Sequence, residues 1–226
     1  MSFAGWSHHQ SRAVWPGVIL GATVFLAGNA SAQTPSETLA RAARTYQGLS
    51  SFSADFWQVI DDPMLGNYRS RGRLVQVSDG RLSLRFTEPA GELIVLDGRH
   101  VWMYLPSTEP GQVRKIPMSS LPDYFNPRSL LDQPARRFVA KSVRHDQING
   151  RPADVVLLTP RDPDLPFSEV SLWVDRDDGL PRRLQFKERS GATRTFTFAD
   201  VLTNQRIPDR TFTFDIPPGV RVIDAM

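Results

Sequence analysis

Few side chains in this sequence are of the types that act as nucleophiles, general bases or metal ligands. The chain has no cysteine, and beyond residue 32 its histidines are His100 and His145. These two lie in separate segments without the short spacing that a zinc site uses, so each is interpreted as an exposed strand residue. G-x-S-x-G, H-E-x-x-H and phosphate-binding glycine motifs do not occur. The sequence therefore predicts no enzyme activity, no cofactor and no metal site.

Carboxylates gather most closely at residues 175–179, Asp-Arg-Asp-Asp-Gly. An EF-hand loop needs oxygen ligands at positions one, three and five and glycine at six, and this run does not follow that spacing. Asp178-Gly179 is instead typical of a two-residue hairpin turn. We interpret the run as a turn. An enzyme with a site scattered along the sequence stays an alternative hypothesis.

The charge of the chain does not indicate nucleic-acid binding. Lys and Arg exceed Asp and Glu by only three, and the basic residues are scattered along the sequence. Arg69, Arg71 and Arg73 alternate on one predicted strand, where a solvated strand face is the favoured interpretation. No nucleic-acid partner is predicted.

Apolar and aromatic side chains are the main feature of the sequence. From Gly72 to Pro106 they alternate with polar residues over several short runs, and they exceed what one face of a sheet needs. A curved sheet with an apolar concave face would enclose an acyl chain, since burying each methylene group contributes about 0.8 kcal/mol. A fully packed core explains the same composition, and both interpretations stay open at this point.

The first 32 residues have the pattern of a secretory signal peptide. Arg12 is their one charged residue, residues 13–27 are almost wholly apolar, and Ala30-Ser31-Ala32 supplies a small-residue cleavage site. The apolar run is shorter than the roughly 20 residues that cross a bilayer. Cleavage after Ala32 is expected to leave residues 33–226 as a single domain in the periplasm.

The remaining elements are predicted to be one helix, a long series of strands and a helical lid. Thr34-Pro35-Ser36-Glu37 is a capping box that opens a helix ending at Gly48. About ten strands then follow, joined by short turns, and such an antiparallel meander curls into a barrel or half-barrel. Residues 119–131 interrupt the strands and are predicted to form two short helices separated by Asn126-Pro127.

In this order and spacing, the motifs resemble those of LolA, the periplasmic carrier family of outer-membrane lipoproteins. The likeness covers residues 34–223 and rests on the motifs Leu49-Ser50-Ser51-Phe52-Ser53-Ala54-Asp55-Phe56, Gly72-x-Leu74, Leu84-x-Phe86-Thr87-x-Pro89, Asp97-Gly98-x-x-Val101-Trp102-x-Tyr104, Leu157-x-x-Pro160, and Phe212-Thr213-Phe214 with Pro217-Pro218-Gly219-Val220.

The resemblance implies an incomplete antiparallel β-barrel covered by short helices, with an apolar cavity for the acyl chains of a lipoprotein. It also implies two partners, an ATP-driven lipoprotein extractor in the inner membrane and a lipoprotein acceptor in the outer membrane. A lid-closing arginine is expected ahead of Leu82, but this chain has Ser78 there. Arg81 and Arg85 are the possible substitutes.

Strand alternation and one choice of face define the predicted binding residues. The predicted lipid-binding cavity is lined by Leu74, Leu82, Leu84, Phe86, Leu96, Trp102, Tyr104, Leu157, Leu172 and Phe186, and the lid contributes Leu121, Phe125, Leu130 and Leu131. A register error of one residue would turn any strand's set to the other face.

These observations lead to the hypothesis of a monomeric periplasmic carrier of lipoproteins. A carrier of another lipid on the same fold is one alternative. An envelope-stress sensor module that binds a membrane-anchored signalling protein is another.

Overall fold

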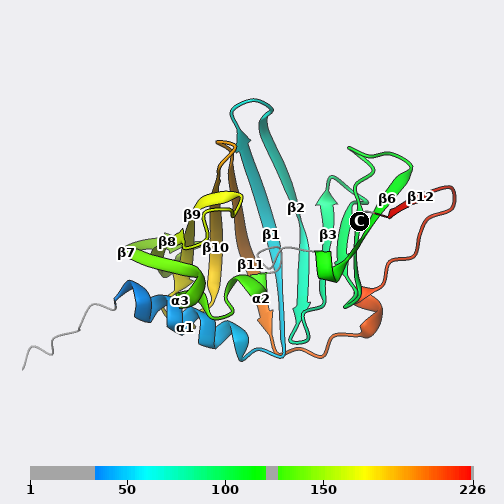
Figure 1. Ribbon diagram of the computed structural model, residues 1–226. Coiled ribbons are helices and arrows are strands. Elements are labelled where there is room, and N and C mark those ends of the chain that lie inside the picture. The colour runs from blue at the N-terminus through cyan, green and yellow to red at the C-terminus, as the bar shows by residue number, and fades with distance from the viewer. Residues whose placement is uncertain (1–33, 121–126, 225–226) are drawn as a thin grey trace, which may run out of the picture. The chain divides into compact units, whose positions relative to one another are not determined.

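The computed structural model describes residues 34–120 and 127–224 (Figure 1). The predicted signal peptide and the predicted lid residues Leu121 and Phe125 lie outside the described residues. Residues 33–226 form one compact unit.

The described part opens with α1, Pro35–Gln47. Its capping box is formed as predicted: the Thr34 hydroxyl accepts a hydrogen bond from the Glu37 N–H, and the Glu37 carboxylate accepts one from the Thr34 N–H. These bonds from Thr34 lower the pKa of Glu37. One face of the helix, including Leu39, Ala42 and Tyr46, is buried, so α1 is an amphipathic helix packed on the sheet.

Twelve strands form one sheet in the described residues, in the order β12-β6-β5-β4-β3-β2-β1-β11-β10-β9-β8-β7. Their bounds are β1 Ser51–Asp62, β2 Gly66–Val77, β3 Leu82–Glu88, β4 Leu93–Leu96, β5 His100–Tyr104, β6 Gln112–Pro117, β7 Phe138–Ile148, β8 Arg151–Pro160, β9 Phe167–Asp175, β10 Pro181–Glu188, β11 Thr193–Thr203 and β12 Arg221–Asp224.

The sheet is antiparallel except at one edge, where β12 runs parallel to β6. The first meander, β1 to β6, spreads to one side of β1, and β11 back to β7 spreads to the other. Because β7 and β12 end the order without pairing to each other, the barrel is not closed. The predicted incomplete antiparallel barrel is confirmed.

Short helical turns connect the two meanders, as the proline-rich segment predicted. They are the 3-10 helix η1, Met118–Ser120, and the helices α2, Pro127–Leu130, and α3, Pro134–Arg137. Figure 1 shows α1, α2 and α3 on one side of the sheet. The helical segment extends to Arg137, beyond the predicted end at Leu131.

Although Phe212 and Phe214 alternate as in a strand, they do not lie in one. Asp209–Phe212 forms the 3-10 helix η3, which begins after Pro208. Phe212 is buried against Leu93 and Val95, and half-buried residues including Phe214 pack around it. We call Leu93, Val95 and Phe212 the outer cluster. The C-terminal segment therefore covers the outer face of β4 and β5.

Candidate functional site

A large apolar cluster covers the face of the sheet on which α1 and α2 lie. We call it the inner cluster, and it includes Leu39 and Tyr46 of α1 together with side chains from both meanders. Of the predicted cavity residues, Leu74, Leu82, Leu96 and Leu172 are buried members, and Leu84, Phe86 and Phe186 pack against them half-buried.

The predicted lid residues Leu130 and Leu131 are also buried in the inner cluster. A space of about 10 Å³ beside Leu131 is lined by Tyr46, Phe52, Leu74, Leu131, Pro181, Leu184 and Phe198. That space is about the minimum that one water needs, and it is far too small for an acyl chain. In this arrangement the lid leucines occupy the apolar interior themselves.

Three predicted cavity residues were assigned to the wrong face. Cross-strand partners point to the same side of a sheet, and Leu96 pairs with Val101, so Trp102 faces the opposite side with its own partner Val95. Tyr104 follows Trp102, and both pack against the outer cluster.

Leu157 was misassigned for the same reason. Val156 and Leu158 pair with Leu172 and Val170 of β9, and these four residues belong to the inner cluster. Leu157 lies between them in the strand and so points to the outer face.

Arg81 and Arg85 do not close the lid through any hydrogen bond of the described residues. Arg81 pairs with Asp79 and Asp209 at 2.8 and 2.9 Å and lies over the Phe212 ring, while Arg85 donates to the Thr213 carbonyl at 3.2 Å. These carboxylates raise the pKa of Arg81, with the Asp209 hydrogen bond as the largest contribution. Both arginines thus fasten the C-terminal segment to the outer face.

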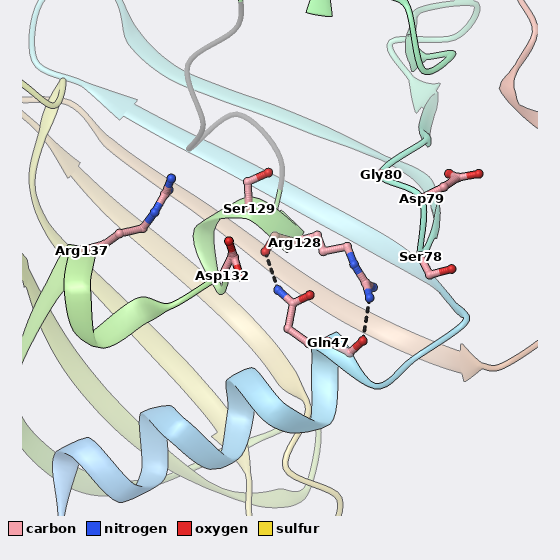
Figure 2. A pocket seen from close by; sticks show the side chains of 8 residues that line it. All are labelled: Gln47, Ser78, Asp79, Gly80, Arg128, Ser129, Asp132 and Arg137. Atoms are coloured by element: carbon pink, nitrogen blue, oxygen red, sulfur yellow. Dashed lines mark hydrogen bonds between the residues drawn. The ribbon is translucent and has the colours of Figure 1, made fainter. Parts of the chain in front are cut away.

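A different arginine ties the lid to α1. Arg128 of α2 donates to the Gln47 carbonyl at 2.6 Å and to the Leu49 carbonyl at 3.4 Å. In return, the Gln47 side-chain amide donates to the Arg128 carbonyl at 2.8 Å, and Figure 2 shows the reciprocal pair between Gln47 and Arg128. We call these three hydrogen bonds the clasp.

The clasp has a clear physical origin at the end of α1. The last carbonyls of a helix lack intrahelical partners and carry partial negative charge, so a guanidinium placed there is stabilising. Neither Arg128 nor Gln47 was predicted as a site residue from the sequence. Two features of the sequence point to them. Arg128 is the one basic residue of the predicted lid segment, residues 119–131, and the last carbonyls of the predicted helix need hydrogen-bond donors.

Beside the clasp lies a polar pocket of about 290 Å³, lined by Gln47, Ser78, Asp79, Gly80, Arg128, Ser129, Asp132 and Arg137 (Figure 2). Ser78, where the resemblance would have an arginine, lines this pocket at the β2–β3 turn. Ser78 therefore lies at the edge of the lid. The guanidinium that forms hydrogen bonds between lid and body, however, is that of Arg128, which belongs to the lid.

A buried polar contact connects α1 with β2. The Tyr46 hydroxyl donates to the Gln76 side-chain oxygen at 2.5 Å, inside the barrel wall. Burial raises the pKa of Tyr46, so the phenol stays protonated and acts as a hydrogen-bond donor that fixes α1 on β2.

The acidic run at residues 175–179 is the predicted hairpin turn. Asp175 accepts hydrogen bonds from the Asp177 N–H at 2.9 Å and from Arg182 at 3.0 Å, and it also pairs with Arg151. Although burial opposes its ionisation, these bonds, Arg151 first, lower the pKa of Asp175 to about 2. Within residues 34–120 and 127–224, no three His, Cys, Asp or Glu side chains converge to hold a metal ion.

The family model for the outer membrane lipoprotein carrier protein LolA matches residues 47–215. The chain belongs to the LolA family. The matched LolA region runs from the clasp residue Gln47 to just beyond η3, and so includes every strand except β12.

Curated relatives carry the LolA-family name outer-membrane lipoprotein carrier protein. The chain is 28% identical to the one from Chromohalobacter salexigens, over 90% of this chain and 94% of the relative. It is 25% identical to the one from Aeromonas salmonicida, over 92% and 97%. These relatives are named as carriers.

Among solved structures, the fold is similar to an uncharacterised conserved protein from Thermus thermophilus, with a TM-score of 0.54 and 13% identity over 85% of this chain and all of the other. In the part of the chain that the structure describes, no helix is long and apolar enough to cross a membrane.

Proposed function

We propose that this chain is a periplasmic carrier that holds the acyl chains of lipoproteins against its inner cluster and carries them from the inner to the outer membrane. One observation carries the proposal: in a LolA-family chain, the apolar inner face is occupied by Leu130 and Leu131 of a short lid. An acyl chain would replace these leucines when the lid moves, because it offers the same apolar surface.

The energetics suit a reversible exchange. Moving the lid exposes apolar surface and breaks the clasp, and both changes cost free energy. An entering acyl chain recovers about 0.8 kcal/mol for each methylene it buries. Burial of a long chain therefore contributes more free energy than lid opening costs, and burial of a short chain contributes less. The inner face thus selects long acyl chains without a charged partner.

The proposal includes processing and partners. Residues 1–32 are removed after Ala32 on export, and the remaining chain acts as a monomer. An ATP-driven extractor in the inner membrane loads it, and an acceptor in the outer membrane unloads it. The support is the signal-peptide pattern of the sequence and the names of the curated relatives.

The test is acyl-chain binding by the protein purified from the periplasm of an expressing Gram-negative host. A triacylated lipopeptide and the same peptide without acyl groups are titrated against it, and lipid that copurifies is identified by mass spectrometry after denaturation. We expect binding of the acylated peptide only. Absence of both bound lipid and acyl-dependent binding would overturn the carrier function.

Crosslinking in the same host separates the carrier from the sensor alternative. Crosslinks to the subunits of an inner-membrane transporter support the carrier. Crosslinks to a membrane-anchored signalling protein alone contradict it.

A further inference from the structure

Exposed apolar side chains gather on one hairpin, β1–β2, which is separate from the lid. The large apolar residues exposed in the described structure are Trp57, Met64, Leu65, Tyr68, Val139, Leu202 and Ile216. Four of them lie on this hairpin. Trp57 and Tyr68 point to opposite faces of it, whereas Met64 and Leu65 lie next to each other at its tip and are each 89% exposed. Neighbouring exposed large apolar side chains of this kind mark an interaction site.

The tip is a turn that is ordered by hydrogen bonds and leaves the side chains of Met64 and Leu65 exposed to solvent. The Asp62 carboxylate accepts hydrogen bonds from the backbone N–H groups of both residues, at 2.8 and 2.9 Å. Gly66 closes the turn at a φ of 83°, in the region that favours glycine. These contacts order the turn without covering either apolar side chain.

The hairpin also extends beyond one of its neighbours. The β2–β3 pairing begins at Arg71, so residues 66–70 pair with β1 alone among the described strands. Strand β1 starts just after α1 and has 12 residues, which places the tip about 40 Å along the sheet from the clasp. Figure 1 shows the β1–β2 turn projecting at the end of the sheet away from α1.

The two arms of the hairpin differ in side-chain chemistry behind the tip. On the β2 arm, exposed Asn67 is followed by Tyr68, which has an amphipathic ring and is 41% exposed, and then by exposed Arg69. An apolar tip backed by an aromatic and a cationic side chain suits the boundary of a bilayer from its acyl region to its phosphates.

We propose that the β1–β2 tip inserts into the headgroup–acyl boundary of a phospholipid bilayer. Two side chains are too few for a stable protein interface, which needs roughly 800 Å² from each partner, but they suit a shallow and reversible membrane contact. The carboxylates of Asp61 and Asp62 beside the tip limit the depth of insertion. This goes beyond the carrier proposal, because neither the inner cluster nor the lid takes part.

Vesicle flotation tests the proposal with vesicles of phosphatidylethanolamine and phosphatidylglycerol. The double variant M64S/L65S removes the apolar tip while Asp62 still orders the turn, and the control L202S removes an exposed leucine, 52% exposed, from β11. We expect the tip variant to lower the vesicle partition constant about tenfold and the control to leave it unchanged. Equal partition of the tip variant and the unsubstituted protein would overturn the proposal.

A second measurement places the contact at the tip. The chain has no cysteine, so L65C and L202C can each carry a single environment-sensitive fluorophore. We expect a blue shift on vesicle addition at position 65 and none at position 202. An equal response at both positions, or none at position 65, contradicts insertion by the tip.

Acyl-peptide titration of the same proteins separates this inference from the proposed function. The tip variant is expected to bind the acylated peptide like the unsubstituted protein. If the unsubstituted protein binds no acyl chain but still reaches vesicles through the tip, the carrier function fails and the membrane contact stands.

Discussion

At the scale of single residues, Arg128 is the main departure of this chain from the arrangement that its resemblance implied. The expected arginine would have reached the lid from the position of Ser78, whereas Arg128 sits on the lid and reaches the end of α1. Both arrangements connect lid and body by hydrogen bonds to backbone carbonyls. The carbonyls at the end of α1 lack intrahelical partners, and in this chain they accept these hydrogen bonds from the lid side.

Removing the Arg128 guanidinium should therefore favour the open lid. If the hydrogen bonds of the clasp contribute about 1 kcal/mol to closure, R128M raises the population of the open form and the apparent affinity for an acylated peptide about fivefold. The measurement is a fluorescence titration with the peptide. R189M is the matched control, since Arg189 also donates to a carbonyl, that of Leu165, and is not part of the clasp. A lower affinity in R128M alone would mean that Arg128 holds cargo rather than the lid.

Seven of the ten residues that strand alternation predicted for the cavity lie in or against the inner cluster. Trp102 and Tyr104 lie on the other face, because the residues that face the inner cluster change from even to odd numbers across the β4–β5 hairpin, where Leu96 pairs with Val101. The sequence pattern predicts that every second residue of a strand shares a face. The turn decides whether the odd-numbered or the even-numbered residues of the next strand lie on that same face. Arg128 could not be found by alternation, since its role depends on a contact between elements 81 residues apart in sequence.

At the scale of elements, the β2–β3 pair approaches so closely at Gly72 that no side chain fits. A Cβ there would lie 2.1 Å from the Arg85 carbonyl oxygen, beside the register shift between Arg71 and Gly72. We expect G72A to lower the free energy of unfolding by about 2 to 3 kcal/mol, measured by urea denaturation.

The facing strand supplies the control for G72A. The buried Ser83 hydroxyl has no hydrogen-bond partner in the described structure, so S83A removes an unpaired polar atom and should be neutral or stabilising. Equal losses in G72A and S83A would mean that general sensitivity of this strand pair, not the close approach, explains the effect.

The β9–β10 turn is expected to make stability depend on acid pH. The pKa of Asp175 is about 2 in the folded chain, below its ordinary value of 3.8, so its carboxylate stabilises the fold above pH 3.8. That contribution, about 2 kcal/mol, is lost as the pH falls through 3.8 towards 2. Thermal unfolding across this range should show the loss in the unsubstituted protein.

D175N tests the source of this dependence. The variant should lose a similar amount of stability at neutral pH and show a flatter profile between pH 3.8 and 2. D177N, at a more exposed position of the same turn, should keep the profile of the unsubstituted protein. An unchanged slope in D175N would assign the acid sensitivity to other carboxylates.

At the scale of the whole described unit, the inner cluster and the outer cluster of the sheet have different coverings. The outer cluster is covered by the C-terminal segment, which Arg81 and Arg85 fasten to it. The inner cluster is covered by α1 and by Leu130 and Leu131 of the lid, which the clasp ties to the end of α1. The sequence predicted an apolar excess, but alternation alone could not divide it between the two faces of the sheet, because that division depends on the register across each turn and on what covers each face.

A pair of substitutions distinguishes the two clusters. L84D places a charge on the half-buried edge of the inner cluster, so it should abolish acyl-peptide binding at a modest cost in stability, since the carboxylate reaches water. F212A empties the centre of the outer cluster and should cost about 3 to 5 kcal/mol, while the folded fraction binds the acyl-peptide normally. Denaturation and peptide titration of both variants measure the two effects. If L84D unfolds the chain and F212A removes binding, the inner face is the permanent core and the outer face is the cargo surface, opposite to the proposal.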